Sequence, residues 1–515
     1  MNKQNAPQKI YTCPMHFLVR HSLFILLYLF FLIFIFLTFK DYGISWDESF
    51  YLNSGKVYFE NFFNPQEVSK LIPQYHLVTH GAFFDVLYYL ILKIFNQTSS
   101  FEFLHLVKAL FASITLIFIY ASINILTRNR YVSLVGTLLF IFSPRWLGDI
   151  FDNHMDITAT LLTSIIILLS LKIFSDKKSE IWGLPLYGLV SAIAFSHRVI
   201  LIIFPALFIY LYIFKKFKKE ELNSNYIGFI LSFLVFIAAL FLTDPYIRIN
   251  GLLGIVEKAI YFTFFNKDIT ILFEGKFYPA TNLPWYYFVK QILITSPLII
   301  IFLTISGALF MIKKFINLGF IKTTSHIYLL MSLYIIFVLV YIFKPVTFDS
   351  WRHFLFLIVP MVLIAALGLN FIFQSRRIYL KLIFILLVVN SILVIKDVYG
   401  LYPYHYMYFN ELIGGIKGAY KNYETEYWGK SYKEAILWLK ENEIKETKLY
   451  KLATCSNPTQ SAYYFADNMI HTKNLGEADY FICITKNNEH NKVGGEIVHT
   501  VIREGVPLNF IKKMD

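Results

Sequence analysis

The sequence predicts a polytopic α-helical membrane protein with about 11 transmembrane helices and a small α/β domain at its C-terminal end. Three observations predict this fold class. The 515 residues are 57% hydrophobic and only 16% charged, and the mean hydropathy is +0.55, values typical of membrane proteins. Apolar runs long enough to cross a bilayer recur through the first three quarters of the chain. The short connectors between these runs alternate in charge, a pattern typical of membrane insertion.

Each predicted span is an apolar run of roughly 20 residues, the length that crosses a hydrocarbon core about 30 Å thick. No small-residue cleavage site follows the first run, so we expect a retained helix and not a signal peptide. The expected spans are residues 22–39, 105–126, 131–147, 155–175, 181–196, 198–214, 226–243, 288–311, 326–343, 354–373 and 378–395.

The charges of the connectors predict which side of the cell membrane each one faces. Lys and Arg are enriched in cytoplasmic loops, so the basic connectors are expected inside. The acids, the tryptophans and most histidines fall in the other connectors. This pattern predicts a cytoplasmic N-terminus and an extracytoplasmic C-terminus, and it explains much of the net charge of +13 without a nucleic-acid partner. The basic connectors hold Arg128 and Arg130, Lys177 and Lys178, Lys215, Lys216, Lys218 and Lys219, Lys313, Lys314 and Lys322, and Arg376 and Arg377.

The same rule settles two ambiguous segments. Residues 181–214 as one helix would be about 51 Å long, too long for one pass. Basic clusters stand at both ends, so we expect a hairpin broken at Ser196-His197-Arg198. Residues 81–95 are shorter and contain Asp85 and Lys93, and they are expected to form an interfacial helix.

Two domains are expected. Residues 1–395 form the membrane domain, with a large first outer loop at about 40–104, and residues 396–515 form the extracytoplasmic domain. In that second domain the pattern predicts a helix over 431–442 and strands over 448–453, 480–485 and 496–502. Cys455 and Cys483 either form a disulfide in an oxidising compartment or remain two free thiols.

Asp47 and Glu48 follow the first span and place two adjacent carboxylates just outside the membrane. A group transfer to a hydroxyl or an amine needs a general base within hydrogen-bond reach of the proton. A carboxylate at the exit of a helix supplies such a base. The alternative is a solvated pair that caps the following helix.

A second acidic group lies at the start of the fourth span. Asp149, Asp152 and Asp156 are spaced by three and four residues, which would place their carboxylates on one helix face. With Asn153 and His154, these acids are candidates for a divalent metal site, in which Asp156, Asp152 and His154 are the possible ligands, or for orienting a substrate. The alternative is a helix cap whose acids complement the helix dipole.

Basic groups on the outer side form the third element of the expected site. Arg352 and His353 begin a span, Arg198 lies at the hairpin break, and Lys290 begins another helix. Insertion disfavours positive charge on this side, so these residues need an explanation. Arginine binds phosphate in bidentate fashion and stabilises a phosphate leaving group. The alternative is an Arg paired with Asp349 or with lipid headgroups.

Aromatic residues on the outer side include Trp285 and Tyr286, which stack on sugars or belong to the interfacial belt common to membrane proteins. The sequence has no phosphate-binding P-loop and no dinucleotide fingerprint. A donor delivered by the lipid bilayer is therefore favoured over a soluble nucleotide.

Several pieces in this order carry a family resemblance: Trp46-Asp47-Glu48, His80-Gly81, Ser143-Pro144-Arg145 through Asp156, Leu283-Pro284-Trp285-Tyr286-Tyr287 and Asp349-Ser350-Trp351-Arg352-His353. The chain resembles the polyprenyl-phosphate-dependent glycosyltransferases of the GT-C superfamily. The similarity is to glycosyltransferase family 39, the protein O-mannosyltransferase and aminoarabinose transferase type, in its bacterial branch. Tyr408 to Gly415 and Glu426-Tyr427-Trp428-Gly429 look like segments of bacterial members with an appended outer domain.

The resemblance implies an inverting transfer of a sugar from a polyprenyl-phosphate donor on the outer leaflet, to an acceptor that is a protein, a lipid or a glycan. It implies that Asp47 is the base, with Glu48 beside it, and that Asp156 holds the acceptor or a metal. One departure bears on the acceptor type: Gly81-Ala82 stands where better-known members have prolines. The resemblance places the phosphate site at Arg352 with His353. Further candidates for binding the phosphate are Arg198, Lys290 and Arg145, and the candidates for contacting the substrate are His80, Trp285, Tyr286 and Asn153.

Two other functions fit a membrane protein of this kind. A transporter or flippase of lipid-linked sugars keeps ionisable groups near the bilayer midplane, whereas here they gather at the outer ends of the spans. A ligase or polymerase of lipid-linked polysaccharides would favour Arg and His with dispensable acids. For the glycosyltransferase, Asp47, Asp156 and Arg352 must lie together at one centre.

Overall fold

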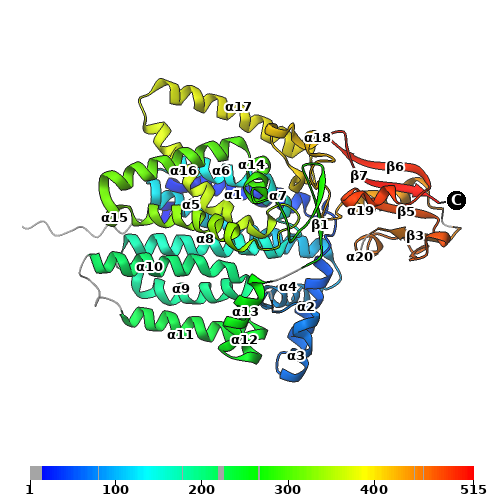
Figure 1. The fold of residues 1–515 in the computed structure, drawn as a ribbon, viewed down its shortest axis with the longest axis horizontal. Coiled ribbons are helices and arrows are strands. Elements are labelled where there is room, and N and C mark those ends of the chain that lie inside the picture. Colours follow the sequence, from blue (N-terminus) through cyan, green and yellow to red (C-terminus); the bar gives the residue numbers. More distant parts are fainter. Residues whose placement is uncertain are drawn as a thin grey trace, which may run out of the picture.

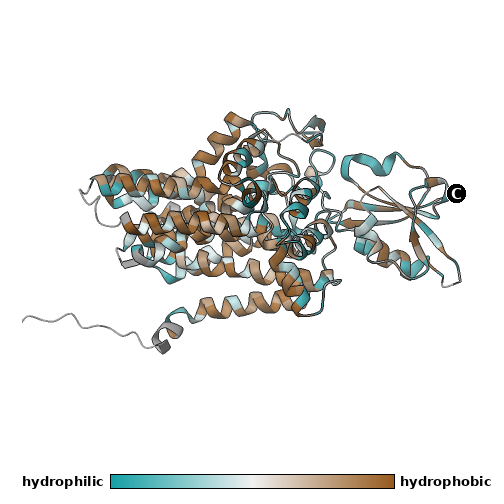
Figure 2. Cartoon of the chain, turned by 90° about the horizontal axis from the view of Figure 1, so that it is seen from below, coloured by the Kyte–Doolittle hydropathy of each residue, from teal (hydrophilic) through white to brown (hydrophobic). Residues whose placement is uncertain are grey.

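The computed structural model describes residues 14–78, 80–176, 178–218, 226–264, 267–445, 447–455 and 458–514. Figure 1 shows a long molecule with a bundle of helices at one end and a β-sheet domain, which carries the C-terminus, at the other. Hydrophobic residues dominate the bundle, and hydrophilic residues are more frequent in the C-terminal domain (Figure 2). The predicted class, a polytopic helical membrane protein with a small C-terminal domain, is confirmed.

The bundle is built from long apolar helices that run along the long axis of the molecule (Figure 1). These are α1 (Pro14–Thr38), α5 (Phe101–Thr127), α6 (Arg130–Ile141), α8 (His154–Ser175), α9 (Lys178–His197), α10 (Ile203–Lys218), α11 (Tyr226–Thr243), α15 (Leu298–Phe343), α16 (Ile358–Gln374) and α17 (Ile378–Gly400).

Within the described residues, seven helices are long and apolar enough to cross a membrane. This number is lower than the predicted one for reasons that the helix bounds explain. The predicted span 288–311 is divided at Ser296-Pro297 into a separate helix, Tyr287–Thr295, and the start of α15. α15 then runs on into the predicted span 326–343, so that two predicted spans count as one helix. α6 and α11 are apolar but shorter. α9 covers the predicted span 181–196 and contains Pro185.

The packing of α15 against α16 depends on glycine. A Cβ on Gly307 would stand 1.9 Å from the carbonyl oxygen of Ile364, and one on Gly368 would stand 2.4 Å from that of Leu303. The two backbones therefore touch, as is common where membrane helices associate through small residues. Gly319 has φ +71° and breaks α15 into two helical halves. Nearly all residues of α16 and its lead-in are buried, and they form the centre of the bundle.

The predicted break in residues 181–214 is confirmed. α9 ends at His197, Arg198 is extended (φ −148°, ψ 117°), and the 3-10 helix η1 (Val199–Ile202) leads into α10. The segment predicted as a helix at 81–95 is α4 (Phe83–Ile94).

The long connectors lie at the end of the bundle that faces the C-terminal domain (Figure 1). They contain short helices and one hairpin, which place the polar side chains of the loops over the ends of the spans. Their elements are α2 (Glu48–Glu60), α3 (Pro65–Gln74), α4, α7 (Pro144–Asp149), α12 (Pro245–Asn250), α13 (Leu253–Thr263), β1 (Thr270–Phe273), β2 (Lys276–Pro279), α14 (Tyr287–Thr295) and η3 (Arg352–Leu357).

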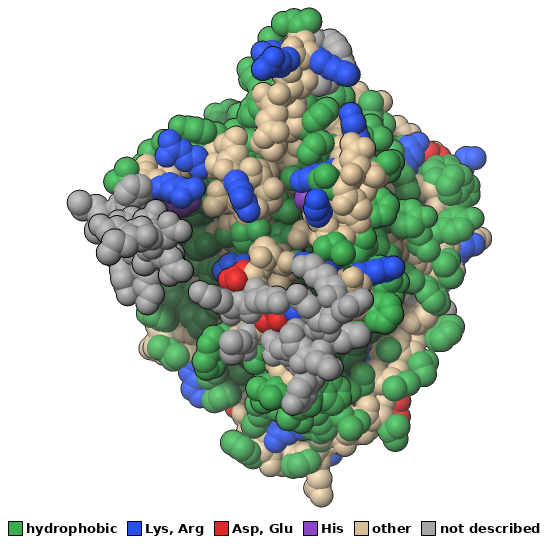
Figure 3. Space-filling model, turned by 90° about the vertical axis from the view of Figure 1, so that its left-hand side faces the viewer, with side chains coloured by type: hydrophobic (Ala, Val, Ile, Leu, Met, Phe, Trp, Pro, Cys, Tyr) green, Lys and Arg blue, Asp and Glu red, His purple; other side chains and the backbone are tan. Residues whose placement is uncertain are grey.

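The opposite end of the bundle is basic. Figure 3 looks at this end and shows many Lys and Arg side chains and few acids. Arg128 caps α5, Arg130 begins α6, and the last turn of α10 carries a cluster of lysines. Lys177 and Lys219 of the predicted basic connectors lie outside the described residues.

The C-terminal domain is a five-stranded mixed sheet of order β4-β3-β5-β7-β6, with α19 (Tyr432–Asn442) packed on one face. β4, β3 and β5 are parallel, and β7 and β6 complete the sheet in antiparallel fashion. The predicted helix and the three predicted strands are present. The strands are β3 (Tyr450–Thr454), β4 (Met469–His471), β5 (Tyr480–Ile484), β6 (Glu496–Arg503) and β7 (Val506–Lys513).

Shorter elements join the bundle to this sheet and connect its strands. They are η4 (His405–Met407), η5 (Glu411–Ile413), α18 (Gly415–Ala419), α20 (Pro458–Ala462), η6 (Leu475–Glu477) and η7 (Lys486–Asn491).

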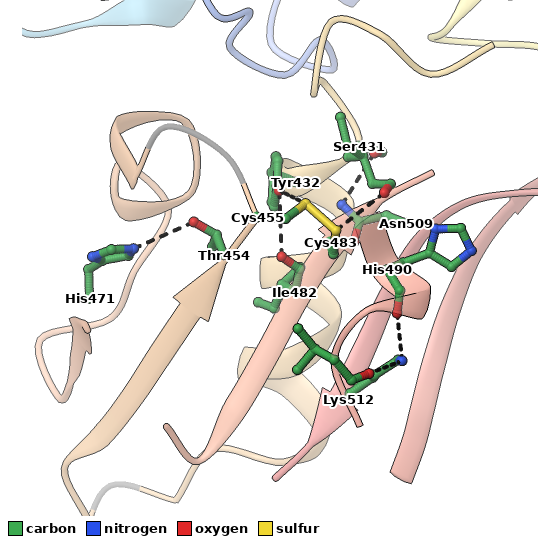
Figure 4. Close-up of a disulfide and its surroundings, with 12 residues drawn as sticks. Ser431, Tyr432, Thr454, Cys455, His471, Ile482, Cys483, His490, Asn509 and Lys512 are labelled. Carbon is green, nitrogen blue, oxygen red and sulfur yellow. Dashed lines mark hydrogen bonds between the residues drawn. A yellow bond between two sulfur atoms is a disulfide. The ribbon is translucent and has the colours of Figure 1, made fainter. Parts of the chain in front are cut away.

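A disulfide joins Cys455, directly after β3, to Cys483 in β5 (Figure 4). It links neighbouring strands, and the Tyr432 hydroxyl of α19 lies 3.4 Å from the Cys455 sulfur. The question that the sequence left open is therefore answered in favour of pairing. Disulfides persist in oxidising compartments.

We expect alkylation of the unfolded, unreduced protein to modify one of its three cysteines, and alkylation after reduction to modify all three. Mass spectrometry of the alkylated chain makes the count. Replacing Cys455 and Cys483 together by Ser should lower the free energy of unfolding by about 3 kcal/mol, because the cross-link restricts the unfolded chain. Three modified cysteines before reduction would contradict the pairing.

Candidate active site

Asp47 stands at the start of α2 with its side chain turned toward solvent. It occupies the N-cap position but makes no side-chain capping hydrogen bond. Its side chain is 41% exposed, whereas that of Glu48 is 1% exposed. The capping alternative is therefore not adopted, and of the two adjacent acids only Asp47 has a carboxylate that a substrate can reach.

The Arg352 guanidinium lies among three carboxylates. Its Nη1 atom is 3.6 Å from Asp156 Oδ2 and 3.9 Å from Asp47 Oδ2, and its Nε atom is 3.1 Å from Asp349 Oδ2. Its central carbon stands 4.5 Å from the ring centroid of Trp428. Asp47, Asp156 and Arg352, which come from three separate parts of the chain, thus meet at one centre.

Asp156 is held in place by two neighbours. The amide of Asn153 donates to Asp156 Oδ2 at 2.5 Å, and the Arg198 guanidinium forms an ion pair with Oδ1. Arg198 also donates to the carbonyl oxygen of His353 at 2.9 Å. The hairpin break after α9 is what brings Arg198 to this position, and it ties the starts of α8, η1 and η3 together.

Glu48 points away from this centre and into the bundle. Its carboxylate lies 2.6 Å from Lys108 Nζ and 3.1 Å from His105 Nε2, both on α5. Burial alone would raise its pKa, but His105 and Lys108 lower the pKa to about 2. Glu48 therefore carries a buried negative charge that fixes α2 to α5, and it does not face the Asp47 side of the centre.

The predicted arrangement of Asp149, Asp152 and Asp156 on one helix face is wrong. α7 ends at Asp149 and α8 begins at His154, so the chain turns between them. The Asn153 amide contacts both Asp149 and Asp156, whereas Asp152 turns away to Lys430 at 2.8 Å.

The candidate metal ligands Asp152, His154 and Asp156 each have a different partner. Asp152 pairs with Lys430, His154 lies 2.9 Å from Asp85, and Asp156 binds arginines. In the described part of the chain, no group of three or more His, Cys, Asp or Glu side chains is placed to hold a metal ion. These three residues do not fit a shared metal site in this arrangement.

His80 contributes to a neighbouring buried cluster. Its Nε2 atom is 3.6 Å from the Asp85 carboxylate, which also contacts His154. Burial alone would raise the pKa of Asp85, but His154 and His80 hold it below its ordinary value. The Tyr51 ring packs edge-on against both histidines. This cluster fixes α4 to the start of α8, and through Tyr51 it also contacts α2, the helix that follows Asp47.

The side chains of the remaining expected site residues contact other partners than the carboxylates around Arg352. Lys290 forms an ion pair with Glu274, and the Tyr286 hydroxyl donates to the same carboxylate at 2.9 Å. Trp285 is 72% exposed. Arg145 is buried and donates to the Tyr427 hydroxyl at 2.8 Å. His353 lies next to Arg352, with its ring 4.5 Å from that of Phe348.

Sequence reasoning missed three groups that face Arg352 or its partners. Lys267 Nζ lies 5.2 Å from the Phe348 ring, which itself packs on the Arg352 guanidinium. Trp428 and Lys486 come from the C-terminal region. Lys267, Trp428 and Lys486 stand in polar stretches of sequence, where nothing local indicates a contact with the site. Lys108, the partner of Glu48, does have such an indication, because it stands inside a predicted span, where a charged residue needs a partner.

Residues 79–242 match the family described as dolichyl-phosphate-mannose-protein mannosyltransferase. The predicted resemblance is thus confirmed over a stretch that holds Asn153, Asp156 and Arg198, whereas Asp47 and Arg352 lie outside it. No curated protein matches the chain.

The chain is similar to several solved structures. ArnT from Cupriavidus metallidurans bound to undecaprenyl phosphate is 9% identical, with a TM-score of 0.49, over 95% of this chain and 98% of that one. Its apo state is 9% identical, with a TM-score of 0.48, over 95% and 97%. The apo oligosaccharyltransferase of Archaeoglobus fulgidus is 10% identical, with a TM-score of 0.45, over 86% and 66%.

We expect Glu48→Gln to lower the free energy of unfolding by about 3–5 kcal/mol, because it leaves the buried Lys108 without its counter-charge. The thermal midpoint of the purified protein in detergent measures this. Glu60→Gln is the matched control, since it removes an exposed acid at the other end of α2.

The same ion pair should make stability depend on pH. The folded-state pKa of Glu48 is about 2, below the ordinary value of 4.5, so the pair stabilises the fold above the ordinary value. That contribution is lost as the pH falls from about 4.5 toward 2, and Glu48→Gln should lack this part of the acid sensitivity. An unchanged acid profile in the variant would contradict the assignment.

Proposed function

We propose that the protein is an inverting glycosyltransferase that moves a sugar from a polyprenyl-phosphate donor to an acceptor hydroxyl or amine on the outer side of the membrane. The observation that carries this proposal is the convergence of Asp47 and Asp156 on Arg352, at 3.9 and 3.6 Å. An exposed carboxylate beside a buried guanidinium provides a base next to a phosphate site. The family matched by residues 79–242 takes its name from a lipid-phosphate donor, dolichyl phosphate mannose.

Arg352 is proposed to hold the donor phosphate. Its guanidinium packs against the rings of Trp428 and Phe348, at 4.5 and 5.0 Å, which limits its movement. A planar guanidinium held in this way suits bidentate binding of phosphate. Lys267 Nζ lies 5.2 Å from the centroid of the same Phe348 ring and adds a second positive charge. As the sugar leaves, the carrier phosphate gains a negative charge, which these cations stabilise in the transition state.

Asp47 is proposed to be the general base. It takes the proton of the acceptor group as that oxygen or nitrogen attacks the anomeric carbon. The bond from this carbon to the phosphate oxygen breaks in the same step, which inverts the anomeric configuration and releases polyprenyl phosphate. Asp156 is bound by Arg198 and Asn153, so its role is to orient Arg352 and not to accept a proton.

We expect Asp47→Asn to lower sugar transfer by a factor of about 100 or more, because a positioned base contributes about 10² to 10⁴ to the rate. Membranes containing each variant are given a set of polyprenyl-phosphate-linked sugars, and mass spectrometry detects the glycosylated product. The thermal midpoint of Asp47→Asn should stay close to that of the parent, since the Asp47 side chain is 41% exposed and makes no capping hydrogen bond, and Asp156 and Asp349 still balance the charge of Arg352.

Glu60→Gln is again the control and should keep the parent rate. Transfer at the parent rate by Asp47→Asn would exclude Asp47 as the base. Passage of the labelled donor across the bilayer without any glycosylated product would favour the transporter alternative.

We also propose that the C-terminal domain lies outside the cytoplasm. The basic end of the bundle is opposite to it, and its disulfide suits an oxidising compartment (Figures 1 and 3). In intact cells stripped of the outer wall, an added protease should remove a C-terminal tag and leave an N-terminal tag intact. A protected C-terminal tag, with cleavage only after lysis, would contradict this orientation.

A further inference from the structure

Residues 43–46, which lead to Asp47, are held by contacts with residues 427–464, at the start of the C-terminal domain. The backbone N–H of Ile44 donates to the Tyr464 hydroxyl at 3.1 Å, and the Ile44 carbonyl accepts from Gln460 Nε2 at 3.0 Å. The indole N–H of Trp46 donates to the carbonyl of Tyr427 at 2.5 Å. The backbone before Asp47 is therefore bound on both sides to residues more than 380 positions further along the chain.

Close backbone contact reinforces this attachment. A Cβ atom on Gly43 would stand 2.1 Å from the carbonyl oxygen of Lys430. Only glycine permits this approach, so the two segments pack without a side chain between them. Lys430 also forms the buried ion pair with Asp152.

Residues 427–464 also hold Arg352, through Trp428. The Trp428 ring stacks on the guanidinium at 4.5 Å, and its indole N–H donates to Asp149 at 3.2 Å. Gln460 binds the Trp428 carbonyl at 2.8 Å in addition to that of Ile44. One amide thus links the segment before Asp47 to the residue that packs on Arg352.

Lys486 reaches the centre from the start of η7, just after β5. Its Nζ atom is 2.8 Å from Asp349 Oδ1, while Arg352 Nε is 3.1 Å from Oδ2 of the same carboxylate. Burial alone would raise the pKa of Asp349, but Lys486 and Arg352 hold it below its ordinary value. The two cations share one buried negative charge.

The backbone next to Arg352 needs such support. Asp349 and Ser350 have φ values of +54° and +66°, a left-handed conformation that is unfavourable for residues other than glycine. The Ser350 hydroxyl donates to Gln291 at 2.9 Å, and Lys486 holds the Asp349 side chain. These contacts keep the strained turn in place and with it the start of η3.

We propose that the C-terminal domain is part of the active centre and that Lys486 is a positioning residue for Arg352, acting through Asp349. By taking one oxygen of Asp349, Lys486 leaves the outer nitrogens of the Arg352 guanidinium available for the donor phosphate. In its absence, the buried carboxylate draws Arg352 toward itself. This inference rests on the proposed function, because it assumes that Arg352 binds the phosphate of a polyprenyl carrier.

The test uses the full-length protein and two measurements: the affinity for a polyprenyl phosphate without a sugar, and the KM values for donor and acceptor. We expect Lys486→Met to weaken polyprenyl-phosphate binding and to raise the donor KM about tenfold or more, as expected from the loss of a charged contact. The acceptor KM should not change. Lys486→Arg keeps the charge and should restore values close to the parent.

The matched control is Lys448→Met, which breaks the exposed ion pair between Lys448 and Asp479 of the same domain, 2.6 Å long in the parent. It should leave both measurements unchanged. If Lys486→Met does not accumulate in membranes, Lys486→Gln replaces it, because that variant keeps a hydrogen-bond donor and removes only the charge.

The outcomes separate this inference from the proposed function. A parent protein that binds no polyprenyl phosphate and transfers no sugar would overturn both. A parent that binds and transfers, with Lys486→Met matching it in affinity and donor KM, would overturn the positioning role alone. A loss in Lys486→Met that only follows its thermal midpoint, and that Lys486→Arg does not restore, would also overturn that role.

Discussion

The buried guanidinium of Arg352 is the group on which the arrangement of the loops depends. A positive charge at the end of a buried span is costly unless acids surround it. Asp47, Asp156 and Asp349 supply those acids, and each belongs to a different part of the chain: Asp47 stands just before α2, Asp156 is in the first turn of α8, and Asp349 precedes η3. One side chain therefore fixes the relative positions of three segments. Arg198 extends the network, because it binds both Asp156 and the carbonyl of His353.

Features with a local or periodic signal could be predicted from the sequence. Apolar runs and alternating charges located the spans, and basic clusters on both sides of 181–214 located the break at Arg198. The strands of the C-terminal domain followed from their alternation. The same signals indicated that outer loops carry the acids and Arg352. Each of these inferences needs only neighbouring residues and the thickness of a bilayer.

Features that depend on contacts between distant segments could not be predicted. Asp47 and Glu48 are adjacent acids, but α2 turns one toward solvent and the other toward Lys108 of α5. The spacing of Asp149, Asp152 and Asp156 suggested one helix face, but a turn between α7 and α8 sends Asp152 to Lys430. Nothing in the local sequence indicates a role for Lys486, because its role depends on the fold, which brings its side chain to Asp349.

The attachment of residues 43–46 to the region after Tyr427 has a consequence for biosynthesis. The partners of Ile44 and Trp46 lie more than 380 residues after the Asp47 loop, so ribosomes make them long after that loop has emerged. A nascent chain that has not yet reached Tyr427 therefore has its membrane helices but not the contacts that support Asp47 and Arg352. Under the proposed function, such a chain lacks the arrangement that acts on a lipid-borne sugar.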